Sequence, residues 1–309
     1  MVLIAGRKID IRVSTVPTVH GEKIVMRLLF QEEKLMQLRH LGLAKYILQP
    51  YQNMINSSGG IILVTGPTGS GKTTTLYASL AEIDNEARNI ITIEDPVEYK
   101  LSGYSQIEVK PKVGLTFANA LRSVLRQDPD VIMVGEMRDT ETAQIAIQSA
   151  LTGHLVFSTV HTNSAPATIT RLIDMGIEPF LVSSSIIGVL AQRLVRRICP
   201  DCRKSYQPHP EQLRELGIKE VSFRNLDRRV FRGNGCDNCR QTGYRGRIGI
   251  HELLVMSEGV KNTILESSDS DTIKKQGLKE KMITLRRDGV NKILHGLTTA
   301  EEILTITSE

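Results

Sequence analysis

Between residues 61 and 160 the chain alternates short apolar runs with longer amphipathic stretches. Four of the apolar runs have the length of buried strands: IILVTG (61–66), NIITIED (89–95), DVIMVGE (130–136) and HLVFSTV (154–160). The stretches between them fit helices, and residues 115–127 gather their apolar side chains on one face. Strands that alternate with helices predict an α/β fold with a parallel sheet covered on both sides.

The two ends of the chain follow other patterns. In residues 1–30, IDIRV and KIVMRLL alternate apolar and polar side chains around a PTVHGE connection, which predicts two β-strands. Because a hairpin of this size is marginally stable alone, we expect the chain to begin inside a domain. Beyond Pro166 the sequence predicts mostly helix, interrupted by a cysteine-containing region, and residues 258–309 predict helices again.

Composition and charge narrow the class of protein. The 309 residues predict two or three structural units, and 40% hydrophobic with 24% charged residues is typical of a globular protein. The net charge of +5 fits either an anionic partner or an ordinary, mildly basic surface. Tryptophan is absent and aromatic residues are 4%, which argues against binding of single-stranded nucleic acid by stacking. Without an apolar run of membrane-spanning length or a signal sequence, we expect a cytoplasmic location.

The first apolar strand leads into a phosphate-binding motif. GPTGSGKT, residues 66–73, fits the pattern G-x-x-x-x-G-K-[ST], in which glycines let backbone N–H groups surround phosphate oxygens. Lys72 would neutralise the β- and γ-phosphates, Thr73 would ligate Mg²⁺, and the following helix would direct its N-terminus at the same anion. The predicted contacts to ATP are Gly66, Pro67, Thr68, Gly69, Ser70, Gly71, Lys72, Thr73 and Thr74.

Acidic and imidazole side chains follow the other three strands. Glu94 ends the second strand with Glu98 just beyond it, Glu136 ends the third, and His161 follows the fourth. Because parallel strands end at one edge of a sheet, we expect these groups to share a crevice, although each alone also fits a cap or a structural residue. Glu136 suits Mg²⁺, Glu94 and Glu98 suit polarisation of water, and His161 suits the γ-phosphate. The sequence leaves open which carboxylate is the general base.

All four cysteines occur as two C-x₂-C pairs. Cys199 and Cys202 form the first pair, and Cys236 and Cys239 form the second, 33 residues later. Four thiolates make a closed tetrahedral Zn²⁺ site, which predicts a metal-stabilised subdomain without a catalytic role. A disulfide or a redox pair is the alternative, although reduced thiols are the rule in the cytoplasm.

Taken together, these motifs resemble those of the ATPases of type II secretion and type IV pilus assembly, which are members of the secretion-ATPase superfamily. The resemblance rests on GRKIDIRVSTVPTVHGEKIVMRLL near the N-terminus, the phosphate loop, TIEDPVEY (92–99), the run from 114 to 165 and the cysteine pairs. It implies a RecA-like P-loop core, ATP hydrolysis with Mg²⁺, and a hexameric ring at the cytoplasmic face of the inner membrane. Arg12 and Arg27 are then similar to arginines that reach the γ-phosphate.

The resemblance also implies partners. An inner-membrane platform protein would be driven by the motor, and a membrane-associated docking protein would bind an N-terminal domain missing here. No nucleic-acid partner is expected. The cysteine module is typical of assembly and secretion motors rather than retraction motors, whereas pilus and type II secretion motors are not distinguished.

Three other functions fit parts of the sequence. A nucleic-acid translocase would use the same loop and the basic run RLVRRICPDCRK (193–204), which equally suits acidic lipid or a neighbouring subunit. A transporter ATPase is weakly suggested by LSGYSQ (101–106), interpreted here as a surface loop because it lacks paired glycines. A nucleotide-binding protein without hydrolysis is the third.

These observations divide the chain into five expected segments. They are a partial N-terminal β subdomain (1–30), a linker with a helix (31–56), the P-loop core (57–198), a zinc subdomain (199–247) and a C-terminal helical subdomain (248–309).

Overall fold

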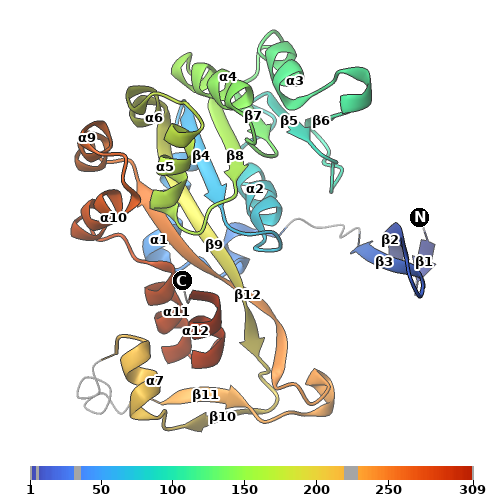
Figure 1. Cartoon of the computed structure of the whole chain (residues 1–309), viewed down its shortest axis with the longest axis vertical. Coiled ribbons are helices and arrows are strands. Elements are labelled where there is room, and N and C mark those ends of the chain that lie inside the picture. Colours follow the sequence, from blue (N-terminus) through green and yellow to red (C-terminus); the bar gives the residue numbers. More distant parts are fainter. Residues whose placement is uncertain (1, 5–6, 31–35, 219–228, 308–309) are drawn as a thin grey trace.

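A seven-stranded sheet forms the centre of the molecule (Figure 1). The computed structural model describes residues 2–4, 7–30, 36–218 and 229–307. The strand order is β12-β9-β4-β8-β7-β5-β6, and all neighbours are parallel except β12, which runs antiparallel to β9. The strands are β4 (Gly60–Thr65), β5 (Ile90–Glu94), β6 (Ser105–Glu108), β7 (Val131–Val134), β8 (Leu155–Val160), β9 (Ile186–Ile198) and β12 (Tyr244–Val255). The predicted α/β class is confirmed.

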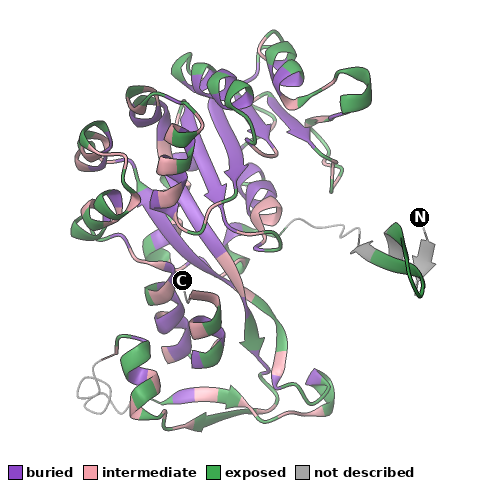
Figure 2. Ribbon diagram, in the orientation of Figure 1, coloured by how far each residue is buried: buried purple, intermediate pink, exposed green. Residues whose placement is uncertain are grey.

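The sheet separates two apolar layers, and its central strands are buried while the outer helix faces are exposed (Figure 2). Along β4, Ile61 and Leu63 belong to one apolar cluster, and Ile62 and Val64 belong to the other. This alternation follows from the period of two in a strand, and every residue is apolar because both faces are covered. The covering helices are α1 (Lys45–Ile55), α2 (Lys72–Leu80), α3 (Phe117–Val124), α4 (Thr140–Leu151), α5 (Ala165–Asp174) and α6 (Pro179–Ser185).

The expectation of mostly helix beyond Pro166 was wrong. After α5 and α6, thirteen residues form β9, and β12 pairs with β9 along most of its length. Residues 248–255, which we had assigned to the helical C-terminal segment, therefore lie in the central sheet. The start of β9 is apolar on both faces because β9 is inserted between β4 and β12, so its sequence lacks alternation. Similarly, part of the predicted surface loop LSGYSQ lies in the edge strand β6.

Smaller elements extend from this core. The two predicted N-terminal strands are confirmed as a hairpin, and a third short strand that was not predicted completes a small sheet. Figure 1 shows this sheet standing apart from the rest of the chain. Its strands are β1 (Val2–Ile4), β2 (Arg7–Thr18) and β3 (Gly21–Phe30). The cysteine region contains β10 (Arg203–Tyr206), α7 (Pro210–Glu215), β11 (Val230–Gly233) and η3 (Asp237–Cys239). The predicted C-terminal helices are α9 (Glu258–Glu266), α10 (Ser270–Lys279), α11 (Leu285–Leu294) and α12 (Ala300–Thr307).

Two short 3₁₀ helices complete the described elements: η1 (Leu38–His40) and η2 (Pro111–Val113). Across the described ranges, every helix is too short or too polar to span a bilayer.

A buried carboxylate joins the C-terminal helices to the sheet. Asp288, on α11, is fully buried and forms an ion pair with Lys292 one turn later. Its oxygens also accept hydrogen bonds from the hydroxyl of Tyr46 on α1, at 2.7 Å, and from the backbone N–H of His251 on β12, at 2.9 Å. Three elements distant in sequence are therefore connected through one side chain.

Replacement of Asp288 by Ala should lower the free energy of unfolding by about 3–5 kcal/mol, because it leaves the Lys292 ammonium buried without its partner. Urea unfolding measures this loss. Asp271→Ala, which removes an exposed carboxylate from α10, should stay within about 0.5 kcal/mol of wild type. Equal effects of the two substitutions would show that the buried ion pair contributes no more to the free energy of unfolding than an exposed carboxylate does.

The buried His251 should make the fold sensitive to acid. Burial and the nearby Lys292 hold the pKa of its imidazole well below the usual 6.5. Below pH 6.5 the unfolded chain therefore binds a proton that the folded chain excludes, and the free energy of unfolding falls by up to about 1.4 kcal/mol per pH unit. Urea unfolding on either side of pH 6.5 should show a shallower dependence for His251→Leu. An unchanged slope would contradict this assignment.

Candidate nucleotide-binding site

The phosphate loop connects the central strand β4 to helix α2, as the sequence predicts. Gly66, Gly69 and Gly71 have positive φ angles of 147°, 80° and 89°, which favour residues without a side chain. A Cβ at Gly66 would lie 2.4 Å from the backbone oxygen of Gln192 on β9. Helix α2 begins at Lys72, so its N-terminus and the loop's backbone share one end of the sheet. This is the geometry of an anion site.

The side chain of Lys72 folds back over the loop. Its ammonium donates to the carbonyl oxygens of Gly66, at 2.8 Å, and Pro67, at 3.2 Å, and lies 3.5 Å from Nδ1 of His161. Partial burial lowers the pKa of Lys72, and the charge of Glu136 acts in the opposite direction. The loop therefore holds its cation among neutral oxygens, within reach of the ends of β7 and β8.

His161 connects Lys72 to Glu136. It follows β8, and its Nε2 lies 3.6 Å from Oε2 of Glu136, which follows β7. The same carboxylate oxygen accepts from Nε of Arg138 at 2.6 Å, and the Glu136 side chain is 13% exposed. Three predicted site residues are thus brought together from three strand ends, in the order Lys72, His161, Glu136.

Threonine hydroxyls fix the segment that carries His161. The hydroxyl of Thr65, at the end of β4, donates to the carbonyl of Val160 at 2.9 Å and accepts from the backbone N–H of Thr162 at 3.0 Å. Thr162 and Thr168 are linked through their hydroxyls at 2.7 Å, which extends the contact to α5. The imidazole is therefore held on backbone that is anchored to the strand feeding the phosphate loop.

Glu94 has a different environment from Glu136. It is 3% exposed and accepts hydrogen bonds from Thr92 at 2.6 Å, from Gln106 at 3.1 Å, and from the hydroxyl of Tyr77 on α2. Burial, together with the hydrogen bond to Glu94, raises the pKa of Tyr77. Both carboxylate oxygens are thus engaged by neutral donors. These contacts link α2 to the end of β5 and to β6.

The remaining predicted residues lie on peripheral segments. Glu98 is exposed in the segment after β5, beyond a cis peptide bond between Asp95 and Pro96. Arg12 and Arg27 occupy directly opposite backbone positions on β2 and β3, in the hairpin that stands apart from the sheet (Figure 1). Their predicted contact with the γ-phosphate stays a prediction.

Sequence reasoning missed Gln192, which lies beneath the loop. Its side chain is 2% exposed and donates to the carbonyl of Ser70 at 2.6 Å, while accepting from the hydroxyl of Thr75 at 2.7 Å. The available signal was a single amide in the apolar start of β9, since buried polar groups need hydrogen-bond partners. Because β9 was not predicted as a strand next to β4, this signal could not place Gln192 beside the phosphate loop.

A cavity of about 260 Å³ lies beside the start of α2. Gly71 and Thr74 line its phosphate-loop side, and Gln192 and His251 contribute polar groups. Its apolar walls come from several elements: Met36, Leu41, Leu194 and Ile248. An apolar cleft with a few polar groups is typical of a small-molecule site, and this one continues directly from the phosphate loop.

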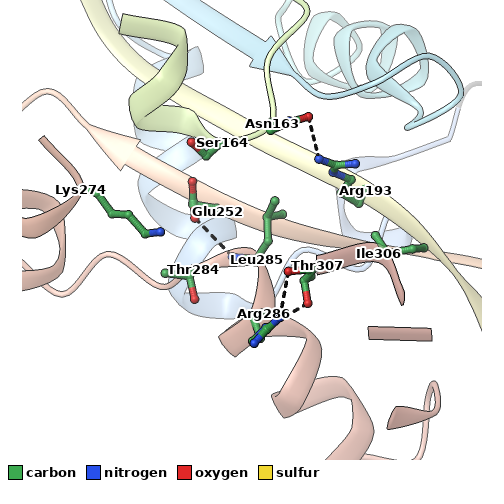
Figure 3. A pocket seen from close by; sticks show the side chains of 10 residues that line it. All are labelled: Asn163, Ser164, Arg193, Glu252, Lys274, Thr284, Leu285, Arg286, Ile306 and Thr307. Atoms are coloured by element: carbon green, nitrogen blue, oxygen red, sulfur yellow. Dashed lines mark hydrogen bonds between the residues drawn. The ribbon is translucent and has the colours of Figure 1, made fainter. Parts of the chain in front are cut away.

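A second cavity, of about 320 Å³, lies where the segment after His161 meets the C-terminal helices (Figure 3). Arg193 of β9 donates to Asn163 at 3.0 Å on one side of it. On the other, buried Glu252 of β12 accepts from the first backbone N–H groups of α5 and α11, at 2.8 and 3.4 Å. The cavity therefore lies at the junction between the sheet and the C-terminal helices.

The four cysteines converge at the far end of β9. Their sulfur atoms all lie within 4.8 Å of one another, and three of the sulfur–sulfur distances are 3.6, 3.9 and 3.9 Å. Zn–S bonds of about 2.3 Å in a tetrahedron place sulfurs about 3.8 Å apart, so the donor set fits Zn²⁺. A disulfide needs sulfurs about 2.05 Å apart, and all four cysteines are free.

Backbone groups orient these thiols. Sγ of Cys239 accepts from the N–H groups of Cys236 and Gly243, both at 3.2 Å, as expected when a thiolate is the ligand. Gly233 and Gly243 approach so closely that a Cβ at Gly233 would lie 2.0 Å from the Gly243 oxygen. This packing closes the chain around the second cysteine pair, and the N–H of Cys199 joins the first pair to it by donating to the Gly243 carbonyl at 2.9 Å.

Comparison with known proteins gives one family. A family model described as Type II/IV secretion system protein matches residues 1–305. The chain is 51% identical over 306 residues to the type II secretion system protein E of Dickeya dadantii, covering 99% of this chain and 60% of that protein. It is 49% identical, with the same coverage, to the type II secretion system ATPase E of Vibrio cholerae. The type IV pilus assembly ATPase PilB of Thermus thermophilus is 50% identical over 301 residues, covering 97% of this chain and 34% of PilB.

Solved structures agree. The pilus retraction motor PilT with bound ADP matches with a TM-score of 0.68 at 28% identity, covering 97% of this chain and 78% of PilT. The ATPase DotB of Legionella pneumophila shares the fold, with a TM-score of 0.69 at 23% identity, covering 97% of this chain and 73% of DotB. The chain belongs to the Type II/IV secretion system protein family and has its RecA-like core. It spans about 60% of the length of the type II relatives.

The cysteine geometry predicts about one zinc ion per chain, which elemental analysis of the purified protein measures. Cys239→Ser should lose most of the metal, because it removes the sulfur that accepts two backbone N–H groups. Ser205→Ala on neighbouring β10 serves as a control and should retain the zinc. A wild-type chain purified without chelators that holds no zinc would contradict the assignment.

Proposed function

We propose that this member of the Type II/IV secretion system protein family is the ATP-hydrolysing part of a motor for type II secretion or type IV pilus assembly. The observation that carries the proposal is the line of contacts from Lys72 through His161 to Glu136 beside the phosphate loop. A cation, an imidazole and a carboxylate at the N-terminus of α2 are the groups that phosphoryl transfer from a triphosphate requires.

The loop would bind the triphosphate through backbone N–H groups and the N-terminus of α2. Lys72 would exchange the carbonyl oxygens of Gly66 and Pro67 for phosphate oxygens, which are stronger partners for an ammonium. Thr73 and Glu136 would hold Mg²⁺, which neutralises phosphate charge when bound. The adjacent 260 Å³ cavity, with its apolar walls, is the place for the base and ribose.

The polar residues then divide into two roles. His161, held between Lys72 and Glu136, would respond to the γ-phosphate, because both of its ring nitrogens face charged groups. Glu94 accepts three hydrogen bonds in a buried site, which favours positioning of α2 over activation of water. We therefore assign activation of the attacking water to Glu98 and leave Glu136 as the Mg²⁺ ligand. We retain Arg12 and Arg27 as γ-phosphate ligands supplied through the hairpin.

The larger assembly is proposed from the relatives and the resemblance. A hexameric ring on the cytoplasmic face of the inner membrane would drive a membrane platform protein, and a docking protein would recruit it through additional N-terminal sequence. Relatives from type II secretion and from pilus assembly are 49–51% identical to this chain. We therefore keep both type II secretion and type IV pilus assembly as candidate functions. The cysteine module favours a motor of the assembly or secretion class over a pilus-retraction motor.

Glu136→Gln tests the proposal. Turnover should fall on the order of 10²-fold or more, because the charge that faces His161 is lost, while ATP affinity persists. Phosphate release and calorimetric binding of an ATP analogue measure the two quantities. Glu266→Gln, which makes the same change on exposed α9, should leave both unchanged.

Two results would contradict the proposal. A wild-type chain that binds no ATP analogue would remove the nucleotide site. A Glu136→Gln variant that hydrolyses ATP at the wild-type rate would remove the catalytic arrangement described above.

A further inference from the structure

The side chain of Gln192 is built into the underside of the phosphate loop. The amide nitrogen donates to the carbonyl of Ser70 at 2.6 Å, and the amide oxygen accepts from the hydroxyl of Thr75 at 2.7 Å. At 2% exposure, this pair of hydrogen bonds is shielded from competing water. One residue of β9 therefore contacts the last part of the loop and the first turns of α2 together.

The backbone of the same residue supports the other end of the loop. A Cβ at Gly66 would meet the Gln192 carbonyl oxygen at 2.4 Å, and a Cβ at Gly71 would meet the Gln192 amide nitrogen at 3.1 Å. The first and last glycines of the motif are thus both packed against residue 192. Close approach to β9, in addition to phosphate contact, explains why neither position tolerates a side chain.

The contact with Ser70 sets the direction of a neighbouring N–H group. In a planar trans peptide the C=O and N–H bonds point in opposite directions, so holding the Ser70 carbonyl toward β9 turns the Gly71 N–H away from it. That is the direction in which a phosphate oxygen inside the loop accepts a hydrogen bond. Among the described residues, the buried hydroxyl of Ser70 has no partner, so its side chain does not substitute for this restraint.

We propose that Gln192 is a positioning residue for the nucleotide's phosphates, acting through the Ser70–Gly71 peptide group and Thr75. The inference rests on the proposed function, because it assumes that the loop binds phosphate. Gln192 also lines the adjacent cavity, but its action on the phosphates is indirect, because both ends of its amide are hydrogen-bonded to the loop and to α2. It restrains a glycine-rich loop so that the loop's donors are already oriented before phosphate arrives, which removes an ordering cost from binding.

Gln192→Met is the decisive variant, because methionine nearly fills the same volume and lacks both hydrogen bonds. The Kd for the ATP analogue ATPγS, measured by calorimetry with Mg²⁺, should rise about tenfold, since the loop's buried polar groups lose their partners. The Kd for pyrophosphate should rise by the same factor, because the effect lies at the phosphates. Thr75→Val should weaken binding similarly, and Thr75→Ser, which keeps the hydroxyl, should restore it.

The controls separate positioning from general stability. Thr298→Val removes a buried hydrogen bond to the backbone of Arg196 on the same strand, at 2.8 Å, without touching the loop. It should lower the urea midpoint as much as Gln192→Met does while leaving the Kd within about twofold of wild type. Combining Gln192→Met with Thr75→Val should weaken binding by less than the product of the single effects, as expected for contacting residues.

An unchanged Kd in folded Gln192→Met, alongside wild-type protein that binds normally, would overturn this inference and leave the proposed function intact. If Gln192→Met fails to fold, Thr75→Val takes its place, because it removes the hydroxyl on α2 that Gln192 binds. An unchanged Kd in folded Thr75→Val would then overturn the inference. Wild-type protein that binds neither ATPγS nor pyrophosphate would overturn the proposed function and this inference with it.

Discussion

The parallel pairing of β4, β8, β7 and β5 is the constraint on which the site depends. Because these strands run in one direction, Thr65, Val160, Val134 and Glu94 end at the same edge of the sheet. The phosphate loop, His161 and Glu136 follow directly from those ends. A cation, an imidazole and a carboxylate that are distant in sequence thereby become neighbours, and hydroxyls such as Thr65 fix the connecting backbone.

Strand β9 extends this arrangement beyond the site (Figure 1). It carries Gln192 beneath the phosphate loop and Arg193 beside the segment that follows His161. Further along, Nε and Nη2 of Arg196 both donate to Oε1 of Glu302 on α12, at 2.9 and 2.7 Å, and Cys199 then begins the cysteine module. The loop, the C-terminal helices and the cysteine module are therefore attached to one continuous strand.

The sequence predicted most of the core because local signals there agree with the fold. The runs that became β4, β5, β7 and β8 are short, apolar and bounded by turn residues, and the loop motif depends on local spacing. β9 and β12 were missed because their paired residues lie 46 to 67 positions apart, from Tyr244 with Ile198 to Val255 with Gly188, and because the start of β9 shows no alternation. The same limit hid Gln192, whose partner Ser70 is 122 positions away.

A structure of the chain with a non-hydrolysable ATP analogue and Mg²⁺ tests the central claim most directly. The account predicts the triphosphate along residues 66–73, with the Lys72 ammonium moved from the Gly66 and Pro67 carbonyls to phosphate oxygens, and with His161 and Glu136 facing the γ-phosphate. Density for the analogue at any other surface, with Lys72 still bound to those carbonyls, would contradict it.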